Sequence, residues 1–104
     1  MLIGVVAGTV VSSQKDERLT GFKFLVVRQV DLHGQPAGPY VIAADAVGAG
    51  PGEYVLYATG SSARQTDATD GRPIDATVMA IVDTWEVEGE VRYQKDRPVI
   101  VAEA

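Results

Sequence analysis

The chain has 104 residues, of which 46% are hydrophobic and 22% charged, and its formal net charge is −5. A chain of this length forms one domain with one modest core, which excludes a second domain and a deep cleft between domains. The acidic balance and the scattered basic residues argue against a face that binds nucleic-acid phosphates. The absence of cysteine excludes disulfides and thiolate chemistry.

The N-terminal segment predicts a first strand over about Leu2–Ser13, because it is rich in β-branched residues. Gly4 and Gly8 lie inside it, and glycine within a strand often marks a bulge or a barrel bend. The uncharged run is too short to span a membrane, and the first lysine is Lys15, so a secretory signal is not indicated. We therefore expect a soluble, cytoplasmic protein that does not enter a membrane.

The middle of the chain alternates short apolar runs with turn clusters, which is typical of a small barrel. The run Phe24–Val27 is apolar on both faces, so we expect the barrel interior on one side and a neighbouring chain on the other. Residues 60–65 predict a short helical turn with Ser61 or Ser62 as its cap. Strands are predicted at about 22–31, 40–44 and 53–58, with turns at 32–39 and 45–52.

The segment from Ala76 to Val87 fits two patterns. Apolar residues recur in it at helical spacing, but its β-branched content and its setting favour a fifth strand. Val91–Lys95 and then Pro98–Val101 are expected to form a tail hairpin or to contact a partner. The sequence therefore predicts an all-β fold, a five-stranded OB-like barrel with a short helical turn, over residues 1–87 and a tail over residues 88–104.

The sequence contains no strong pattern for a phosphate loop or a catalytic nucleophile. The glycines of 48–52 precede a strand rather than a helix, so they predict a tight turn and no phosphate loop. Ser61 and Ser62 lack the spacing of a hydrolase nucleophile, and the one histidine, His33, lies in a Gly- and Pro-rich loop. No catalytic residue is predicted, and the chain is expected not to be an enzyme.

Carboxylates and aromatic rings leave two alternatives open. Asp67 and Asp70 are spaced for a shared site but lack the calcium-loop pattern, so no metal or other cofactor is predicted. An OB-type barrel could instead bind single-stranded nucleic acid or a small ligand, although the chain has few basic residues for this. Three further aspartates at the edges of apolar stretches could be shifted acids or structural partners: Asp45, Asp75 and Asp83.

Six segments of the sequence carry a family resemblance: 3–15, 19–27, 43–50, 60–64, 73–76 and 81–83. Together they resemble the vertex proteins of bacterial microcompartments, the EutN/CcmL family. The resemblance covers about residues 1–87 in order and at family spacing. It implies an OB-like barrel that forms a homopentamer, in the cytoplasm, at the vertices of a polyhedral shell tiled by hexameric proteins, without nucleic acid, membrane or cofactor. The carboxysome branch is favoured over the metabolosome branches by residues 23–26 and 93–95.

The resemblance also indicates where subunits touch one another or the ring axis. A loop with little side-chain bulk lets another backbone approach closely. Polar residues at a strand end suit a ring axis or a neighbour, and Arg64 is expected to pair with a carboxylate within or between subunits. The expected interface residues are Gly48, Ala49, Gly50, Ser61, Ser62, Arg64 and Asp83.

Overall fold

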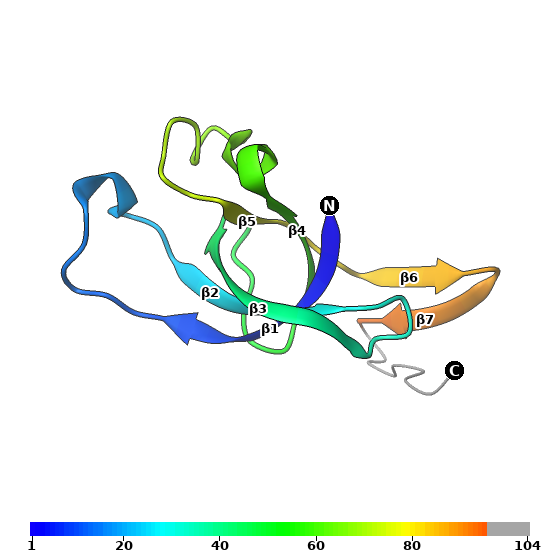
Figure 1. The fold of residues 1–104 in the computed structure, drawn as a ribbon. Coiled ribbons are helices and arrows are strands. Elements are labelled where there is room, and N and C mark those ends of the chain that lie inside the picture. The colour runs from blue at the N-terminus through cyan, green and yellow to red at the C-terminus, as the bar shows by residue number, and fades with distance from the viewer. Residues whose placement is uncertain (96–104) are drawn as a thin grey trace.

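The computed structural model describes residues 1–95 and contains a closed barrel of five strands in the order β1-β2-β3-β5-β4 (Figure 1). β1 pairs antiparallel with both β2 and β4, and β3 pairs parallel with β5, which closes the ring of strands. The predicted five-stranded all-β barrel is therefore confirmed. Its strands are β1 (Leu2–Val10), β2 (Phe24–Val30), β3 (Pro36–Asp45), β4 (Tyr54–Thr59) and β5 (Ala76–Ile81).

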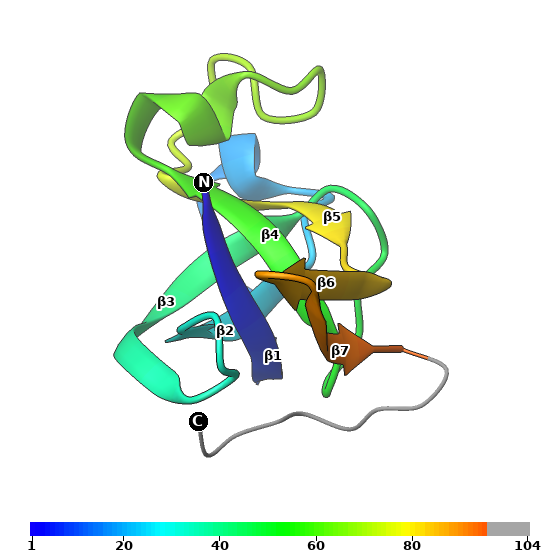
Figure 2. The same cartoon turned by 90° about the vertical axis from the view of Figure 1, so that its right-hand side faces the viewer.

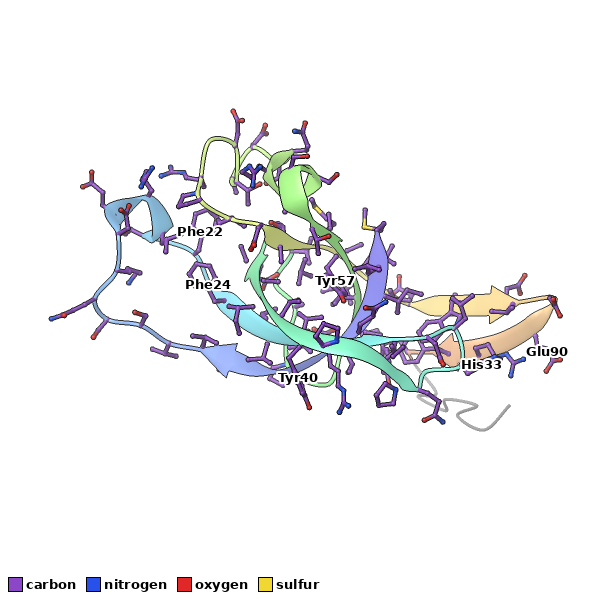
Figure 3. The ribbon with its side chains drawn as sticks, in the orientation of Figure 1. Phe22, Phe24, His33, Tyr40, Tyr57 and Glu90 are labelled. Carbon is purple, nitrogen blue, oxygen red and sulfur yellow. The ribbon has the colours of Figure 1, made fainter. Side chains whose placement is uncertain are left out.

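Alternate residues of the strands fill the barrel. On β2, Leu25 and Val27 are fully buried, whereas Phe24 and Val26 point outward and are half-buried. The ring of Tyr57 lies inside the barrel (Figure 3). Because β-strand side chains alternate between faces, this pattern fixes the pairing register. The buried cluster consists of Val6, Leu25, Val27, Ala43, Ala49, Val55, Tyr57, Ala76 and Val78.

The turn between β2 and β3 is shorter than predicted. Asp31 closes it, because one carboxylate oxygen accepts hydrogen bonds from the backbone N–H groups of His33 and Gln35. The predicted turn at 32–39 is therefore wrong in its second half, and β3 begins at Pro36 instead of Tyr40. Prolines are tolerated there because β3 pairs with β5 only at its far end, at Ala44 and Asp45.

The prediction of a single fifth strand over residues 76–87 is also wrong. The barrel strand β5 ends at Ile81, and a separate strand β6 (Thr84–Val87) pairs with β7 (Glu90–Gln94) in a two-stranded hairpin. Glu88 and Gly89 connect them with φ values of 52° and 83°, as a type I′ turn requires. The predicted segment Pro98–Val101 lies outside the described residues, and the division of the chain at residue 87 stays a prediction.

Two 3-10 turns complete the fold, η1 (Glu17–Leu19) and η2 (Gly60–Arg64). The predicted helical turn at 60–65 is present, but its cap is Thr59, whose side chain makes no capping bond, and not Ser61 or Ser62. Within the described residues, no helix is long and apolar enough to cross a membrane.

The molecule is 45 Å long and 24 Å in its other two dimensions. The loop with η1 and the β6–β7 hairpin lie at opposite ends of the barrel, and η2 lies between them on a third side (Figure 1). Figure 2 views the molecule from the hairpin end and shows β6 in front of the barrel strands. The two ends therefore present different surfaces.

Candidate functional site

The loop after β3 closes one end of the barrel. A carboxylate oxygen of Asp45 accepts hydrogen bonds from the backbone N–H groups of Val47 and Gly48, both at 3.0 Å. Gly48 is exposed and has a φ of 80°, a backbone conformation that favours glycine. The side chain of Ala49 is fully buried in the chain's own core, and the Lys23 ammonium donates to its carbonyl oxygen at 3.1 Å. Of the loop residues expected at an interface, Gly48 is therefore exposed and Ala49 is not, and the loop also exposes Ala46 and Val47.

Glu53 ties this loop to the end of the hairpin. Its Oε1 accepts a hydrogen bond of 2.6 Å from the backbone N–H of Gly50, and its Oε2 accepts one of 2.7 Å from Lys95 Nζ. The Lys95 hydrogen bond, and after it the Gly50 N–H, lowers the pKa of the Glu53 carboxyl below its ordinary value. Gly50, which the sequence placed at an interface, is thus half-buried and held within its own chain.

The turn η2 presents polar side chains on the third side of the barrel. Ser61 and Ser62 are exposed, and the buried Ala63 anchors the turn because Thr77 Oγ1 donates to its carbonyl at 2.7 Å. Arg64 is half-buried and its Nη1 donates to the carbonyl oxygen of Ile74 at 3.0 Å. Within residues 1–95 the recorded partner of Arg64 is this carbonyl and not a carboxylate, so its pairing across subunits stays a prediction.

A surface hollow of about 460 Å³ lies beside η2. Asp75 is exposed at this hollow, and its carbonyl accepts a hydrogen bond of 2.8 Å from the Gly60 N–H. Asp83 lies elsewhere, at the exposed break between β5 and β6, where its carbonyl accepts from the Lys95 N–H at 2.7 Å. The hollow is lined by Val41, Ile42, Thr59, Gly60, Asp75 and Ala76.

The residues that a hydrolase or a metal would require do not converge. His33 lies at the hairpin end of the molecule, away from η2 and its two serines (Figure 3). Among residues 1–95, no three His, Asp or Glu side chains form a group that could hold a metal ion. The features described so far are therefore exposed surfaces: the loop after β3, the turn η2 and the hollow beside η2.

Two features were missed from the sequence. Tyr40 and Ile42 are 56% and 50% exposed on the outer face of β3, where the Arg28 guanidinium lies 5.0 Å from the Tyr40 ring centre (Figure 3). The spacing of Tyr40 and Ile42, two residues apart and so on one face of a strand, is the signal that could have found this face. The second feature is an aromatic cluster that joins the hairpin to β4, formed by Tyr54, Trp85 and Tyr93.

Comparisons with known proteins identify relatives that span nearly the whole chain. The sequence model described as "Ethanolamine utilisation protein EutN/carboxysome" matches residues 1–83. The carboxysome shell vertex protein CcmL of Gloeobacter violaceus is 50% identical over 91% of this chain and 95% of that protein. The bacterial microcompartment shell vertex protein EutN of Salmonella typhimurium is 39% identical over 91% of this chain and 96% of its own.

Solved structures show the same fold. The structure of Gloeobacter violaceus CcmL matches with a TM-score of 0.87 and 49% identity, covering 92% of this chain and 99% of that one. The pentameric microcompartment shell protein GrpN of Rhodospirillum rubrum matches with a TM-score of 0.73 and 46% identity, covering 84% of this chain and 98% of that one.

Proposed function

Because the chain belongs to the EutN/CcmL family, we propose that it is a structural shell protein whose homopentamers cap the vertices of a polyhedral bacterial microcompartment. The observation that carries the proposal is the 50% identity, over 91% of this chain, to a protein named as a carboxysome shell vertex protein. The pentameric state is supported by the similarity to GrpN, a pentameric shell protein. In this role the protein supplies interface free energy and has no catalytic residue or cofactor.

Five-fold units have a clear geometric use in such a shell. A flat layer of hexagonal units cannot close on itself, and replacing some six-fold positions by five-fold ones introduces curvature. The partners of the ring are therefore the hexameric shell proteins beside it. Each contact must repeat around the ring, so each subunit offers one surface to the next subunit and a different one to the previous subunit.

The carboxysome is the compartment that the similarities favour. The CcmL proteins compared here are 45% to 50% identical over 91% of this chain. The microcompartment shell vertex proteins EutN and GrpN, which are not named as carboxysome proteins, are 39% identical over the same share and 49% identical over 83%. We place the protein in the cytoplasm, within the shell, where it contacts neither nucleic acid nor membrane.

The predicted interface residues fit this role at two places. Ser61 and Ser62 are exposed on η2 and Arg64 lies beside them, which suits a ring axis where five copies of a polar turn meet. Gly48 presents a bare backbone that a neighbour can approach. Asp83, exposed at the base of the hairpin, is the remaining candidate contact.

Two measurements test the proposal. Size-exclusion chromatography with light scattering should give the mass of five chains, and a stable monomer would refute the pentamer. Addition of the protein to hexameric shell proteins should convert open sheets or tubes into closed particles, whereas an equal amount of a monomeric variant should not. Salt-dependent binding of single-stranded DNA or RNA would instead support the alternative binding module.

A further inference from the structure

The β6–β7 hairpin carries an acidic tip. Glu86, Glu88 and Glu90 are exposed on it, and the one cation among them, Arg92, is half-buried. Val91 is 52% exposed on the same hairpin. The tip is thus a negatively charged surface with an apolar contact point.

The opposite end of the molecule carries a groove of the complementary kind. The groove has a volume of about 200 Å³. Two lysines, Lys15 and Lys23, lie at its edge, and its apolar border consists of Val10, Val11, Phe22 and Phe24. Val11 is 91% exposed, and the rings of Phe22 and Phe24 are 6.1 Å apart (Figure 3). We call these residues the basic groove.

Neither lysine of the basic groove forms an ion pair within residues 1–95, although the charge of Lys23 helps to lower the pKa of the Glu53 carboxyl. Lys15 Nζ donates to the carbonyl oxygen of Ser12 at 2.9 Å, and Lys23 Nζ donates to that of Ala49 at 3.1 Å. Each ammonium has three donor positions, so each retains capacity for a carboxylate. Positive charge beside exposed apolar side chains suits an acidic partner with an apolar face.

Contact with another protein surface would stabilise the β6–β7 hairpin. A two-stranded hairpin alone is marginally stable in water. The aromatic cluster of Tyr54, Trp85 and Tyr93 holds its base, but its tip extends away from the barrel (Figure 1). A protein surface against the tip would stabilise it by burying Val91.

Other surfaces of the chain suit the tip less well. The hollow beside η2 has Asp75 at its edge, which would repel glutamates. A second hollow is bordered by Arg64, but also by Asp67 and Asp70, whose two negative charges outweigh that one cation. The outer face of β2 and β3 has Arg28, but this cation already lies over the Tyr40 ring. The basic groove alone among these surfaces combines apolar side chains with lysines that lack a carboxylate contact.

We propose that the acidic hairpin tip of one subunit binds the basic groove of the next subunit around the ring, an inference that rests on the proposed pentamer. The tip and the groove lie at opposite ends of the molecule (Figure 1), so one subunit can use both surfaces at the same time, as a heterologous contact requires. The turn η2 lies between the two ends on a third side, so five such contacts leave η2 free to face the ring axis (Figure 1).

Charge reversal tests this contact. The variants Lys15→Glu/Lys23→Glu and Glu88→Lys/Glu90→Lys each place like charges at the contact, whereas the fourfold variant that combines them restores opposite charges. We expect both double variants to raise the protein concentration needed for half-assembly by about tenfold or more, and the fourfold variant to recover most of that loss. The fourfold variant is the matched control, because it carries every substitution of both double variants and yet restores opposite charges at the contact.

The outcomes separate this contact from the pentamer itself. Masses are measured by light scattering over a range of salt concentrations, with circular dichroism to confirm that each variant is folded. If the wild type is a pentamer and both double variants assemble as well as it does, or the fourfold variant does not recover, the hairpin contact is wrong and the pentamer stands. A monomeric wild type would overturn both.

Discussion

The indole Nε1 of Trp85 donates a hydrogen bond of 2.9 Å to the carbonyl oxygen of Leu32. These residues are far apart in the sequence, and their bond joins the hairpin to the turn between β2 and β3. The Trp85 ring also stacks on Tyr93, with ring centres 5.2 Å apart, and Tyr93 contacts Tyr54 of β4 at 4.7 Å. The orientation of the hairpin relative to the barrel therefore depends on this tryptophan.

Replacing Trp85 by phenylalanine should loosen the hairpin. The change removes the indole donor and leaves the Leu32 carbonyl without it, while an aromatic ring remains against Tyr93. We expect the free energy of unfolding to fall by about 1–2 kcal/mol. Amide hydrogen exchange should quicken at Val87 and Glu90 more than in the barrel strands. Equal acceleration throughout the chain would show that the bond does not act locally.

A methyl group at Gly4 should be poorly tolerated. A Cβ there would lie 2.6 Å from Val27 Cγ1 and 2.8 Å from the carbonyl oxygen of Arg28, which belongs to the rigid backbone of β2. Gly4→Ala should therefore lower the free energy of unfolding by about 2–3 kcal/mol in urea titrations. Gly8→Ala is the matched control on the same strand, because nothing lies within 4 Å of a Cβ there. Similar losses for both variants would contradict the packing argument.

The hydroxyl of Thr77 should control the position of η2. It is buried and donates to the carbonyl oxygen of Ala63 at 2.7 Å. Thr77→Val keeps the shape but removes the donor, so the unsatisfied carbonyl should cost about 1–3 kcal/mol of stability. Thr77→Ser keeps the hydroxyl and should retain the position of η2. Crystal structures of the two variants would compare Ser61 and Ser62, and an unmoved η2 in the valine variant would argue against this anchor.

Local patterns were sufficient to predict the barrel because its strands alternate and its turns are rich in glycine and proline. They were insufficient at Val82 and Asp83, where one apolar stretch divides between the barrel and the hairpin. The apolar residues on both sides of the break gave no signal, since Val78 packs in the barrel and Trp85 packs on Tyr93. The turn of the hairpin also gave only a weak signal, because Gly89 favours a positive φ and Glu88, with a φ of 52°, does not.

The predicted interface set shows the same limit. The sequence indicated that the Gly48–Gly50 loop was tight. It did not show that the Ala49 side chain is buried in the core while Gly48 is exposed. The basic groove was not predicted, because Lys15 and Lys23 belong to separate segments that meet only after β1 and β2 pair. Surfaces made from distant segments depend on register, which single-residue patterns do not specify.

The ion pair between Glu53 and Lys95 should make stability depend on pH. The pKa of Glu53 is lower in the folded chain than its unfolded value of about 4.3, mainly because Lys95 donates a hydrogen bond to it. Its contribution is therefore present above about pH 4.3 and is lost as the pH falls through the lower folded pKa. The pKa of Lys95 is raised by the same bond, so the contribution is also lost as the pH rises through that raised value.

The variant Glu53→Gln isolates the contribution of this ion pair to the free energy of unfolding. The Glu53 side chain is 25% exposed and that of Lys95 is 41% exposed, so solvent weakens the pair and the variant should lose only about 0.5–1 kcal/mol near neutral pH. Urea titrations should give a constant difference from the wild type between about pH 5 and pH 9, and a smaller one below about pH 4. Glu17→Gln removes the same charge from an exposed position and should change stability by less than about 0.5 kcal/mol. A Glu53→Gln difference that stays constant down to pH 2 would show that the lost stability does not come from the carboxylate charge.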